Sequence, residues 1–351
     1  MREWRYNRWF NNFNSAKGLM YKQWYDAILT GKFLPPVEAS IDPVNDCPLN
    51  CFWCNSKIPK KRKVKMTREH LLELCRFFKD WGIKGVCFAG GGEPTMHENL
   101  GEAIQLLYSL GIPSSIITNG LFLGYNQMND VASFTEWCGV SIDAATPQTY
   151  KKIKGHDRFN EVIKNIRYIV SHRPKEITYK FLIHPINQHE IYNAICLARN
   201  IGCNRIHIRP VGFLLYQDYE DDYDIAGIEK QIEAGIEDFE SSHFEICAIT
   251  HKYNETMHRK FNFSKCLGTP IMPIFQADGW MTACIDRKGD DSLRLCRHDN
   301  PQDILDFWGS NEHKRIIDKI NIEECGKCTI NYINEQIEHA VKNNEMQWEF
   351  P

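Results

Sequence analysis

Short apolar runs alternate with helix-like repeats over the first two thirds of the chain. Six of these runs have the length and the Val and Ile content of parallel strands that are covered on both faces. We therefore expect strands at residues 37–42, 85–90, 114–119, 138–143, 177–183 and 205–210.

Between the runs, apolar residues recur at steps of three and four, which is typical of amphipathic helices. For one such helix, Thr67 is a candidate N-cap and Gly82 a stop signal, and Leu71, Leu74 and Phe78 lie on one face. Six consecutive strand–helix units with right-handed crossovers predict an α/β fold. Its strands curl into a partial (β/α)6 TIM barrel, with the chemistry at their carboxyl ends.

The pattern changes beyond the sixth unit. Asp278-Gly279 predicts a type I′ turn, with Cys284 on the second strand of the hairpin. We divide the chain into an N-terminal extension (1–36), the barrel (37–240), a small α+β domain with a β-hairpin (241–332) and a C-terminal helix and tail (333–351). The extension is rich in aromatic residues and is expected to cap the barrel; these are Trp4, Tyr6, Trp9, Phe10, Phe13, Tyr21, Trp24 and Tyr25.

The composition and charge of the chain limit the class of protein and the cellular compartment to be expected. The chain has 351 residues, of which 43% are hydrophobic, and its 42 basic and 45 acidic residues give a net charge of −3. This balance argues against a broadly basic surface that grips duplex phosphates, although it leaves room for a local basic patch. The start is too polar for a signal peptide, and no apolar run approaches the roughly 20 residues that span a bilayer. We therefore expect a cytoplasmic protein without a membrane partner, in which the 14 cysteines are read as metal ligands where they cluster.

Three cysteines, Cys47, Cys51 and Cys54, follow the first expected strand within eight positions. A disulfide network needs an even number of thiols, and a structural zinc needs a fourth ligand that this loop lacks. Three thiolates can instead hold three irons of a 4Fe–4S cluster and leave the fourth iron open. A zinc or purely structural site is the alternative.

The spacing of these cysteines, with Trp53 just before the last, resembles the cluster loop of the radical S-adenosylmethionine (SAM) superfamily. The resemblance implies that SAM chelates the open iron through its amino and carboxylate groups. An electron from the cluster then cleaves SAM to a 5′-deoxyadenosyl radical. A flavodoxin- or ferredoxin-type reductant would supply that electron.

A glycine-rich stretch follows the second expected strand and contains Gly90, Gly91, Gly92, Glu93 and Pro94. Glycines at a strand end let the backbone approach a ligand closely, and a glutamate can accept from an ammonium group. The stretch resembles the GGEP motif of the same superfamily, which binds the amino group of SAM. By itself it could also be a plain turn.

Polar residues stand near the ends of the later strands: Asn119, Ser141, Asp143, Asn187 and Arg209. The resemblance implies that the polar residues of the fourth strand, Ser141 and Asp143, contact the ribose or carboxylate of SAM. Asn119, Asn187 and Arg209 lie at the matching edge of their strands and are further candidates for SAM binding. For Ser141 and Asp143, a strand-end cap is the alternative.

A second set of cysteines, Cys266, Cys284, Cys325 and Cys328, lies near the C-terminus. Four cysteines can satisfy all four irons of a second 4Fe–4S cluster, and a structural zinc is the alternative. The arrangement resembles the twitch domain, the shortened form of the SPASM domain of radical SAM enzymes. Because no cysteine follows Cys328, we expect a single auxiliary cluster.

Two further residues are candidates for catalysis. Cys296 could replace a cluster ligand or donate a hydrogen atom to a substrate radical. In sulfatase-maturing relatives an aspartate directly follows the cysteine that corresponds to Cys284, but here that position is Ile285 and Asp286 comes one residue later. We expect Asp286 to be solvated on a hairpin strand, which argues against sulfatase maturation. The remaining cysteines are expected to be inert core residues: Cys75, Cys87, Cys138, Cys196, Cys203 and Cys247.

These features favour a radical SAM enzyme of oxidoreductase or isomerase type that acts on a small polar substrate such as a sugar, cyclitol or nucleoside. The auxiliary cluster would conduct an electron. One alternative is the modification of a peptide or of a nucleotide in a polymer, although the short N-terminal extension argues against a separate peptide-binding domain. The other is a non-catalytic zinc protein.

Overall fold

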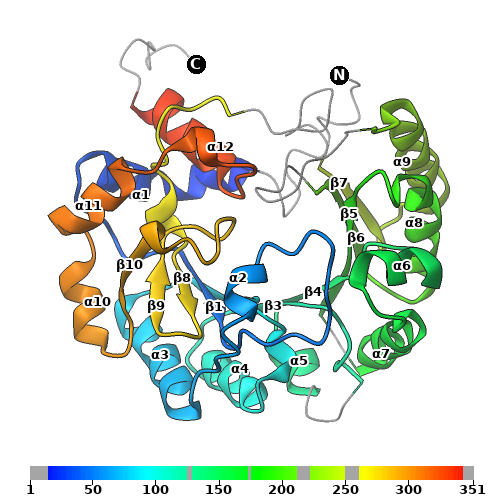
Figure 1. Ribbon diagram of the computed structural model, residues 1–351, viewed down its shortest axis with the longest axis horizontal. Coiled ribbons are helices and arrows are strands. Elements are labelled where there is room, and N and C mark those ends of the chain that lie inside the picture. The colour runs from blue at the N-terminus through cyan, green and yellow to red at the C-terminus, as the bar shows by residue number, and fades with distance from the viewer. Residues whose placement is uncertain (1–14, 125–128, 173–174, 212–221, 250–260, 343–351) are drawn as a thin grey trace.

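The computed structural model describes residues 15–124, 129–172, 175–211, 222–249 and 261–342. In these ranges ten strands form one sheet in the order β10-β9-β8-β1-β2-β3-β4-β5-β6-β7. Strands β1 to β7 pair in parallel, and Figure 1 shows them curling around a common interior with helices on the outside. The expected partial barrel is confirmed.

All six expected strands are present, with ends that differ by at most two residues. The parallel strands are β1 (Glu38–Asp42), β2 (Gly85–Phe88), β3 (Ser114–Thr118), β4 (Trp137–Ser141), β5 (Glu176–Ile183), β6 (Arg205–Pro210) and β7 (Glu245–Ala248). We did not predict β7, because its four residues are too short a run to stand out from the sequence. It pairs with β6, so the parallel sheet continues past residue 240.

Several of the helices begin at a residue whose side chain caps them. They are α1 (Lys22–Leu29), α2 (Lys57–Lys60), α3 (Arg68–Trp81), α4 (Leu100–Ser109), α5 (Asn129–Phe134), α6 (Pro147–Lys154), α7 (Phe159–His172), α8 (Ile191–Asn200), α9 (Ile225–Phe239), α10 (Pro301–Phe307), α11 (Asn311–Asp318) and α12 (Asn331–Glu335). At α3 the Thr67 side chain accepts from His70 N–H, and Gly82 ends the helix with a φ of 93°. Both caps were predicted.

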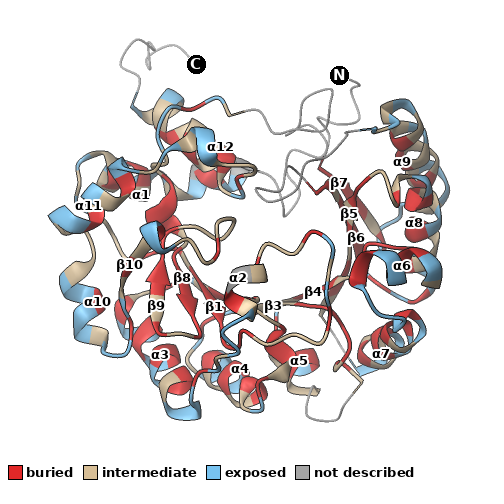
Figure 2. Ribbon diagram, in the orientation of Figure 1, coloured by how far each residue is buried: buried red, intermediate tan, exposed pale blue. Residues whose placement is uncertain are grey.

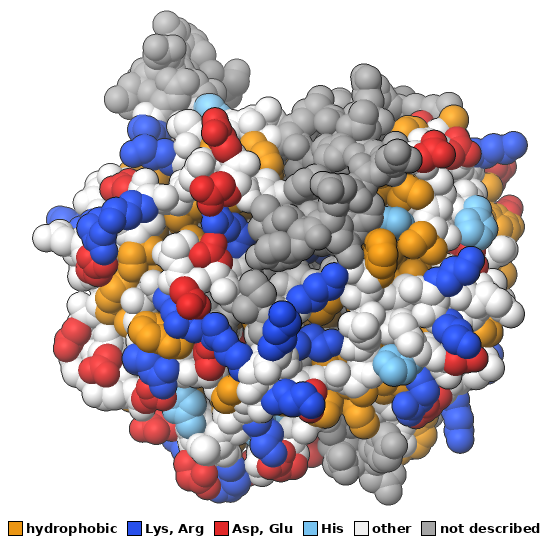
Figure 3. Space-filling view, in the orientation of Figure 1, with side chains coloured by type: hydrophobic (Ala, Val, Ile, Leu, Met, Phe, Trp, Pro, Cys, Tyr) orange, Lys and Arg blue, Asp and Glu red, His pale blue; other side chains and the backbone are white. Residues whose placement is uncertain are grey.

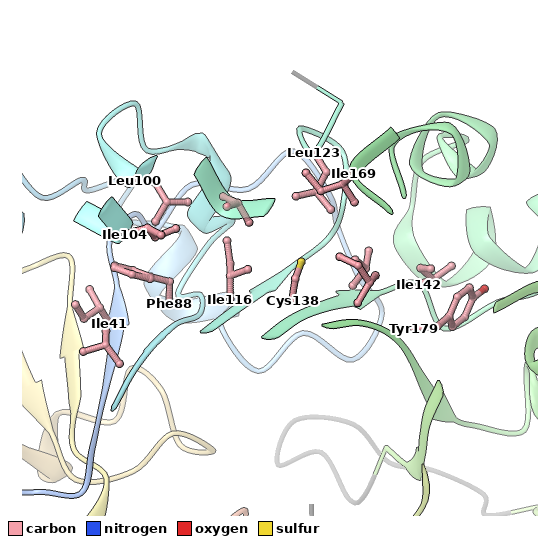
Figure 4. Packing of buried hydrophobic residues seen from close by; sticks show 14 of the residues in the cluster. Ile41, Phe88, Leu100, Ile104, Ile116, Leu123, Cys138, Ile142, Ile169 and Tyr179 are labelled. Atoms are coloured by element: carbon pink, nitrogen blue, oxygen red, sulfur yellow. The ribbon is translucent and has the colours of Figure 1, made fainter. Parts of the chain in front are cut away.

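Side chains on the parallel strands alternate between two environments. Phe88, Ile116 and Tyr179 belong to the hydrophobic core between the sheet and its outer helices. Figure 4 shows Phe88 near Leu100 and Ile104, and Tyr179 near Ile142. Figure 2 shows the strands buried and the outer helix faces exposed. Because neighbouring residues of a strand point to opposite faces, the intervening polar side chains face the barrel interior.

The C-terminal hairpin extends this sheet. It consists of β8 (Ile274–Gln276) and β9 (Trp280–Thr282), followed by β10 (Arg294–Arg297), and β8 pairs in parallel with β1. The predicted type I′ turn is wrong, because that turn needs a positive φ at both central residues and Asp278 has none. Gly279 alone has a positive φ, of 82°, in a three-residue loop. Cys284 lies two residues beyond the end of β9 rather than on it.

Helix α1 packs on the C-terminal segment. Tyr25 and Ile28 are buried with Ile271 and Ile337, and the Tyr25 hydroxyl donates to Gln336 Oε1 at 2.8 Å. The expected cap on the barrel therefore involves the C-terminal region at Tyr25, while residues 4–13 lie outside the described residues. No helix in the described ranges has the length and apolar character needed to cross a bilayer.

Candidate active site

The loop that carries Cys47, Cys51 and Cys54 lies at the carboxyl end of β1. The end of α6 holds its backbone: Asn50 N–H donates to the Lys154 carbonyl at 3.0 Å, and Phe52 N–H donates to the Ile153 carbonyl at 2.8 Å. Trp53 is buried against Ile153. The three predicted cluster cysteines therefore occupy the edge where we expected the chemistry.

The cysteines of this loop are partly buried free thiols. Burial raises the pKa of Cys47 to about 12, and it also raises the pKa of Cys51, an effect that nearby Lys154 opposes. Asn119 Nδ2 donates to Cys47 Sγ at 3.7 Å. The Asn119 amide and the Lys154 ammonium would both stabilise negative charge on thiolates that bind iron.

The glycine turn packs directly on the residues before Cys47. Glu93 N–H donates to the Asp46 carbonyl at 2.8 Å. A Cβ atom on Gly91 would collide with Asn45 Oδ1, and one on Gly92 would collide with the Asp46 carbonyl. Glycines are therefore required here for close approach of two backbone segments.

The Glu93 side chain is buried and accepts four hydrogen bonds. Its two oxygens accept from the backbone N–H and hydroxyl of Thr95, from the Thr118 hydroxyl, and from Asn119 N–H at 2.7 Å. Three of these hydrogen bonds go to Oε1 and one, from Asn119 N–H, goes to Oε2, so Oε2 keeps an acceptor position. The expected contact of Glu93 with the ammonium group of SAM stays a prediction. In this structure Glu93 links the glycine turn to the end of β3, and Pro94 begins the short 3-10 helix that follows.

Asp143 is also engaged within the protein. It is 1% exposed, forms an ion pair with Lys154 at 2.6 Å, and accepts from Leu182 N–H at 2.8 Å. This pair joins the end of β4 to the helix that holds the cysteine loop. The SAM contact expected of Asp143 stays a prediction, and the structure gives the residue a positioning role.

The other three expected SAM residues differ in their surroundings. Asn187 is fully buried and donates to the carbonyls of Asp143 and Leu182. Ser141 ends β4 and Arg209 lies on β6, and both are partly buried. Ser141 and Arg209 are thus the ones whose side chains face the interior at this edge of the sheet.

The four C-terminal cysteines meet at one site. Cys266, Cys284, Cys325 and Cys328 line the same small pocket together with apolar side chains. Asn334 Nδ2 donates to Cys328 Sγ at 3.8 Å, and it also lies 4.0 Å from Cys266 Sγ. The structure brings together the four residues that the sequence analysis grouped.

The two candidate catalytic residues do not occupy the positions that we expected. The Asp286 side chain is 7% exposed, pairs with Lys327 at 3.6 Å and accepts from the hydroxyl of Thr329 at 3.1 Å, so it is not solvated. It supports the segment that carries Cys325 and Cys328. Cys296 lies on β10, packs against the main core and does not line the cysteine pocket.

Sequence reasoning missed two buried lysines. Lys288 is 4% exposed and pairs with Asp42 of β1 at 2.6 Å, and its ammonium also donates to the Gly90 carbonyl at 2.9 Å. It ties the C-terminal region to the glycine turn. Lys154 follows buried Tyr150 by four residues, a helical spacing that could have placed it on the buried face of α6.

A local basic patch lies beside the cysteine loop. Figure 3 shows Lys and Arg side chains gathered over α2 near the centre of the view. The segment contains Lys57, Lys60, Lys61, Arg62 and Lys63. Lys60 donates to the Leu49 carbonyl, and Arg62 pairs with Asp278 of the hairpin loop. The net charge of the chain had left room for such a patch.

The donor sets fit iron–sulfur clusters. In the part of the chain that is described, no three His, Cys, Asp or Glu side chains are grouped so that they could hold one metal ion. In a 4Fe–4S cluster each thiolate binds a different iron, whereas four thiolates around a single ion are the donor set of a structural zinc. Three thiols on one loop, and four around one pocket, have the composition that such clusters require.

Residues 41–198 match the family model of the Radical SAM superfamily. This segment runs from β1 to α8 and contains the cysteine loop and the glycine turn. Residues 41–198 therefore form a radical SAM domain. A domain of this kind implies an enzyme that uses SAM and a 4Fe–4S cluster.

The chain is similar in sequence to two archaeal proteins named "Probable GTP 3′,8-cyclase". It is 30% identical over 205 residues to that of Saccharolobus islandicus (strain M.14.25 / Kamchatka #1), and 29% identical over 210 residues to that of Saccharolobus solfataricus. Each match covers 57% of this chain and 65% of the relative. The chain thus spans just under two thirds of the length of these relatives.

Solved structures share the fold. Streptococcus suis SuiB bound to precursor peptide SuiA has a TM-score of 0.67 at 15% identity, covering 95% of this chain and 81% of SuiB. The native protein anSMEcpe with bound AdoMet has a TM-score of 0.59 at 19% identity, covering 86% of this chain and 89% of that protein. At these identities the likeness concerns the fold alone.

Proposed function

We propose that this chain binds SAM at a 4Fe–4S cluster held by Cys47, Cys51 and Cys54, and that it uses the resulting radical on a small polar substrate in the barrel interior. The observation that carries the proposal is the packing of the glycine turn on the residues just before Cys47 at the carboxyl edge of β1. A cluster at this position, when bound, would pass one electron to SAM and release methionine and a 5′-deoxyadenosyl radical.

The protein's own residues would orient SAM and exclude water. The backbone of Gly90, Gly91 and Gly92 lies beside the cysteine loop, where Gly91 and Gly92 pack closely on Asn45 and Asp46. Glu93 holds this turn in place through four hydrogen bonds. Asn119 and Lys154 would stabilise the thiolates, and Ser141 would face the ribose or carboxylate of SAM.

The four C-terminal cysteines are proposed to hold an auxiliary 4Fe–4S cluster in a twitch domain, as the ligand count and the shared pocket support. Loss of a hydrogen atom to the adenosyl radical would give 5′-deoxyadenosine and a substrate radical. If that radical then loses a proton and an electron, the product is oxidised by two electrons. The second site, whose four cysteines would leave no iron open, would accept the electron that the substrate radical loses. A flavodoxin- or ferredoxin-type protein would supply the electron that cleaves SAM.

A small substrate is favoured by the sequence relatives, whose names refer to GTP, a nucleotide. The fold likeness to a peptide-bound protein does not bear on the substrate at 15% identity. Modification of a peptide, or of a nucleotide in a polymer, is the second candidate. Product analysis with a nucleotide and with a peptide as alternative substrates distinguishes them.

The test uses protein reconstituted without oxygen. We expect about eight irons and eight sulfides per chain, and 5′-deoxyadenosine from SAM and dithionite. Cys196→Ser, a change at a cysteine outside both sites, should leave the iron content and the deoxyadenosine yield unchanged. Zinc in place of iron, with no deoxyadenosine formed, would contradict the proposal.

A further inference from the structure

Two cations in the barrel interior have no acidic partner among the residues that the structure describes. They are Lys180 on β5 and Arg209 on β6, both partly buried. The carboxylates nearest this edge are already paired, since Asp42 binds Lys288 and Asp143 binds Lys154. Among the described residues, neither cation therefore forms an ion pair, and the nearby Asp143 is already paired with Lys154.

Strand register places these two cations close together. In the β5–β6 pairing Lys180 lies opposite His207, and Leu182 lies opposite Arg209. Residues two apart on paired strands face the same side, so both cations point away from the outer helices. In agreement, burial and the nearby Arg209 charge lower the pKa of Lys180 to about 8.

The Lys180 side chain is held in position by its neighbours on β4. Its ammonium lies 5.5 Å from the centre of the Trp137 ring, and a Cβ atom on Gly139 would come within 2.9 Å of Lys180 Cδ. Lys327, which stands between Cys325 and Cys328, adds positive charge that acts on Lys180. Lys180 is thus fixed on the interior side of β4 and β5, near Arg209.

We propose that Lys180 and Arg209 bind a phosphate group of the substrate in the barrel interior. This inference rests on the proposed function and narrows its substrate to a phosphorylated small molecule. Partly buried cations need a counter-charge, and a neutral sugar or cyclitol would supply none. Arginine binds phosphate oxygens through two parallel N–H bonds, and lysine adds a compact positive charge.

The experiment is anaerobic titration calorimetry of the cluster-loaded enzyme with three probes: GTP, inorganic pyrophosphate and guanosine. We expect GTP and pyrophosphate to bind, and Lys180→Met and Arg209→Met each to raise their dissociation constants at least about tenfold. The matched control is Lys175→Met, because Lys175 lies on the surface just before β5 and pairs with Glu136. This control should bind both anions like wild type, and thermal unfolding checks that each variant is folded.

Three results would overturn the inference: binding of guanosine as tight as that of GTP, no binding of pyrophosphate to wild type, or unchanged affinity in both variants. If Arg209→Met loses affinity for SAM while its affinity for pyrophosphate is intact, Arg209 binds SAM. The proposal that Lys180 and Arg209 together bind phosphate would then be wrong. SAM cleavage by wild type without GTP is measured separately. If cleavage fails while anion binding still depends on Lys180, the proposed function is wrong and the anion site stands.

Discussion

The two cysteine sites are similar in their surroundings and different in how the chain builds them. Each has an asparagine amide directed at a thiol, Asn119 in the first site and Asn334 in the second. Each also has a nearby cation, Lys154 and Arg287. The first site takes three cysteines from one loop, whereas the second collects four from three separate segments. We infer that the number of cysteine ligands, more than the surrounding groups, decides whether a site would leave one iron open or bind all four.

The largest expected effect comes from removing one ligand of each site. Cys51→Ala should abolish 5′-deoxyadenosine formation, because the first cluster would lose one of only three ligands. Cys328→Ala should retain a substantial part of SAM cleavage while product formation falls to background. Chromatography of both products measures this, with circular dichroism to exclude unfolding on loss of the second metal centre. Normal product formation by Cys328→Ala would remove the electron-acceptor role.

Next in size are the two buried ion pairs, one in each region. Lys154→Met and Lys288→Met should each lower the free energy of unfolding by about 3–5 kcal/mol, because each leaves a buried aspartate without its partner. Urea unfolding followed by fluorescence measures the loss. Lys22→Met breaks an exposed pair with Asp26 and should cost less than about 1 kcal/mol. Equal losses in all three variants would show that burial does not set the cost.

A smaller loss of folding stability is expected at acid pH, and it should begin in the C-terminal region. His298 and His313 are fully buried there, and burial lowers the pKa of each to about 4. The unfolded chain binds protons at these residues near pH 6.5, so the folded state loses stability as the pH falls from about 6.5 toward 4. Urea midpoints at pH 7, 5.5 and 4.5 should therefore decrease in that order.

His298→Asn should flatten this pH dependence, because it removes one of the two groups. His298 accepts from His70 through Nδ1 and donates to the Gln276 carbonyl through Nε2, both at 2.9 Å, in the neutral form. His156→Asn, at an exposed residue of the barrel, serves as the control and should leave the profile unchanged. An unchanged profile in His298→Asn would reject the assignment.

The smallest effect concerns the two asparagines. A weak amide–thiolate hydrogen bond of about 0.5–1 kcal/mol corresponds to about 20–40 mV for a one-electron couple. Because the bond favours the more negative, reduced cluster, Asn119→Ala should lower the potential of the first cluster alone. Asn334→Ala should lower only that of the proposed auxiliary cluster. Redox titrations followed by electron paramagnetic resonance measure both, and a shift of both clusters in either variant would contradict separate sites.

Most of the barrel could be predicted from local sequence patterns. The caps of α3 and the six strands depend on residues that are neighbours in sequence, so periodicity and turn residues were sufficient to predict them. The hairpin loop was misjudged because Asp278-Gly279 is compatible with more than one turn. Neither Glu93 nor Asp286 could be assigned from sequence alone, since their partners Thr118 and Thr329 lie 25 and 43 residues away.

The sequence by itself determined the first cysteine loop, the glycine turn and the order of strands and helices, because their residues lie within a few positions of each other. Only the tertiary structure decided which charges are paired. Lys288 reaches Asp42 across 246 residues, while Lys180 and Arg209 are left facing the interior. The physical reason is that hydrogen bonds and ion pairs depend on distances of a few ångströms, and for residues far apart in the chain these distances exist only after the sheet has closed around them.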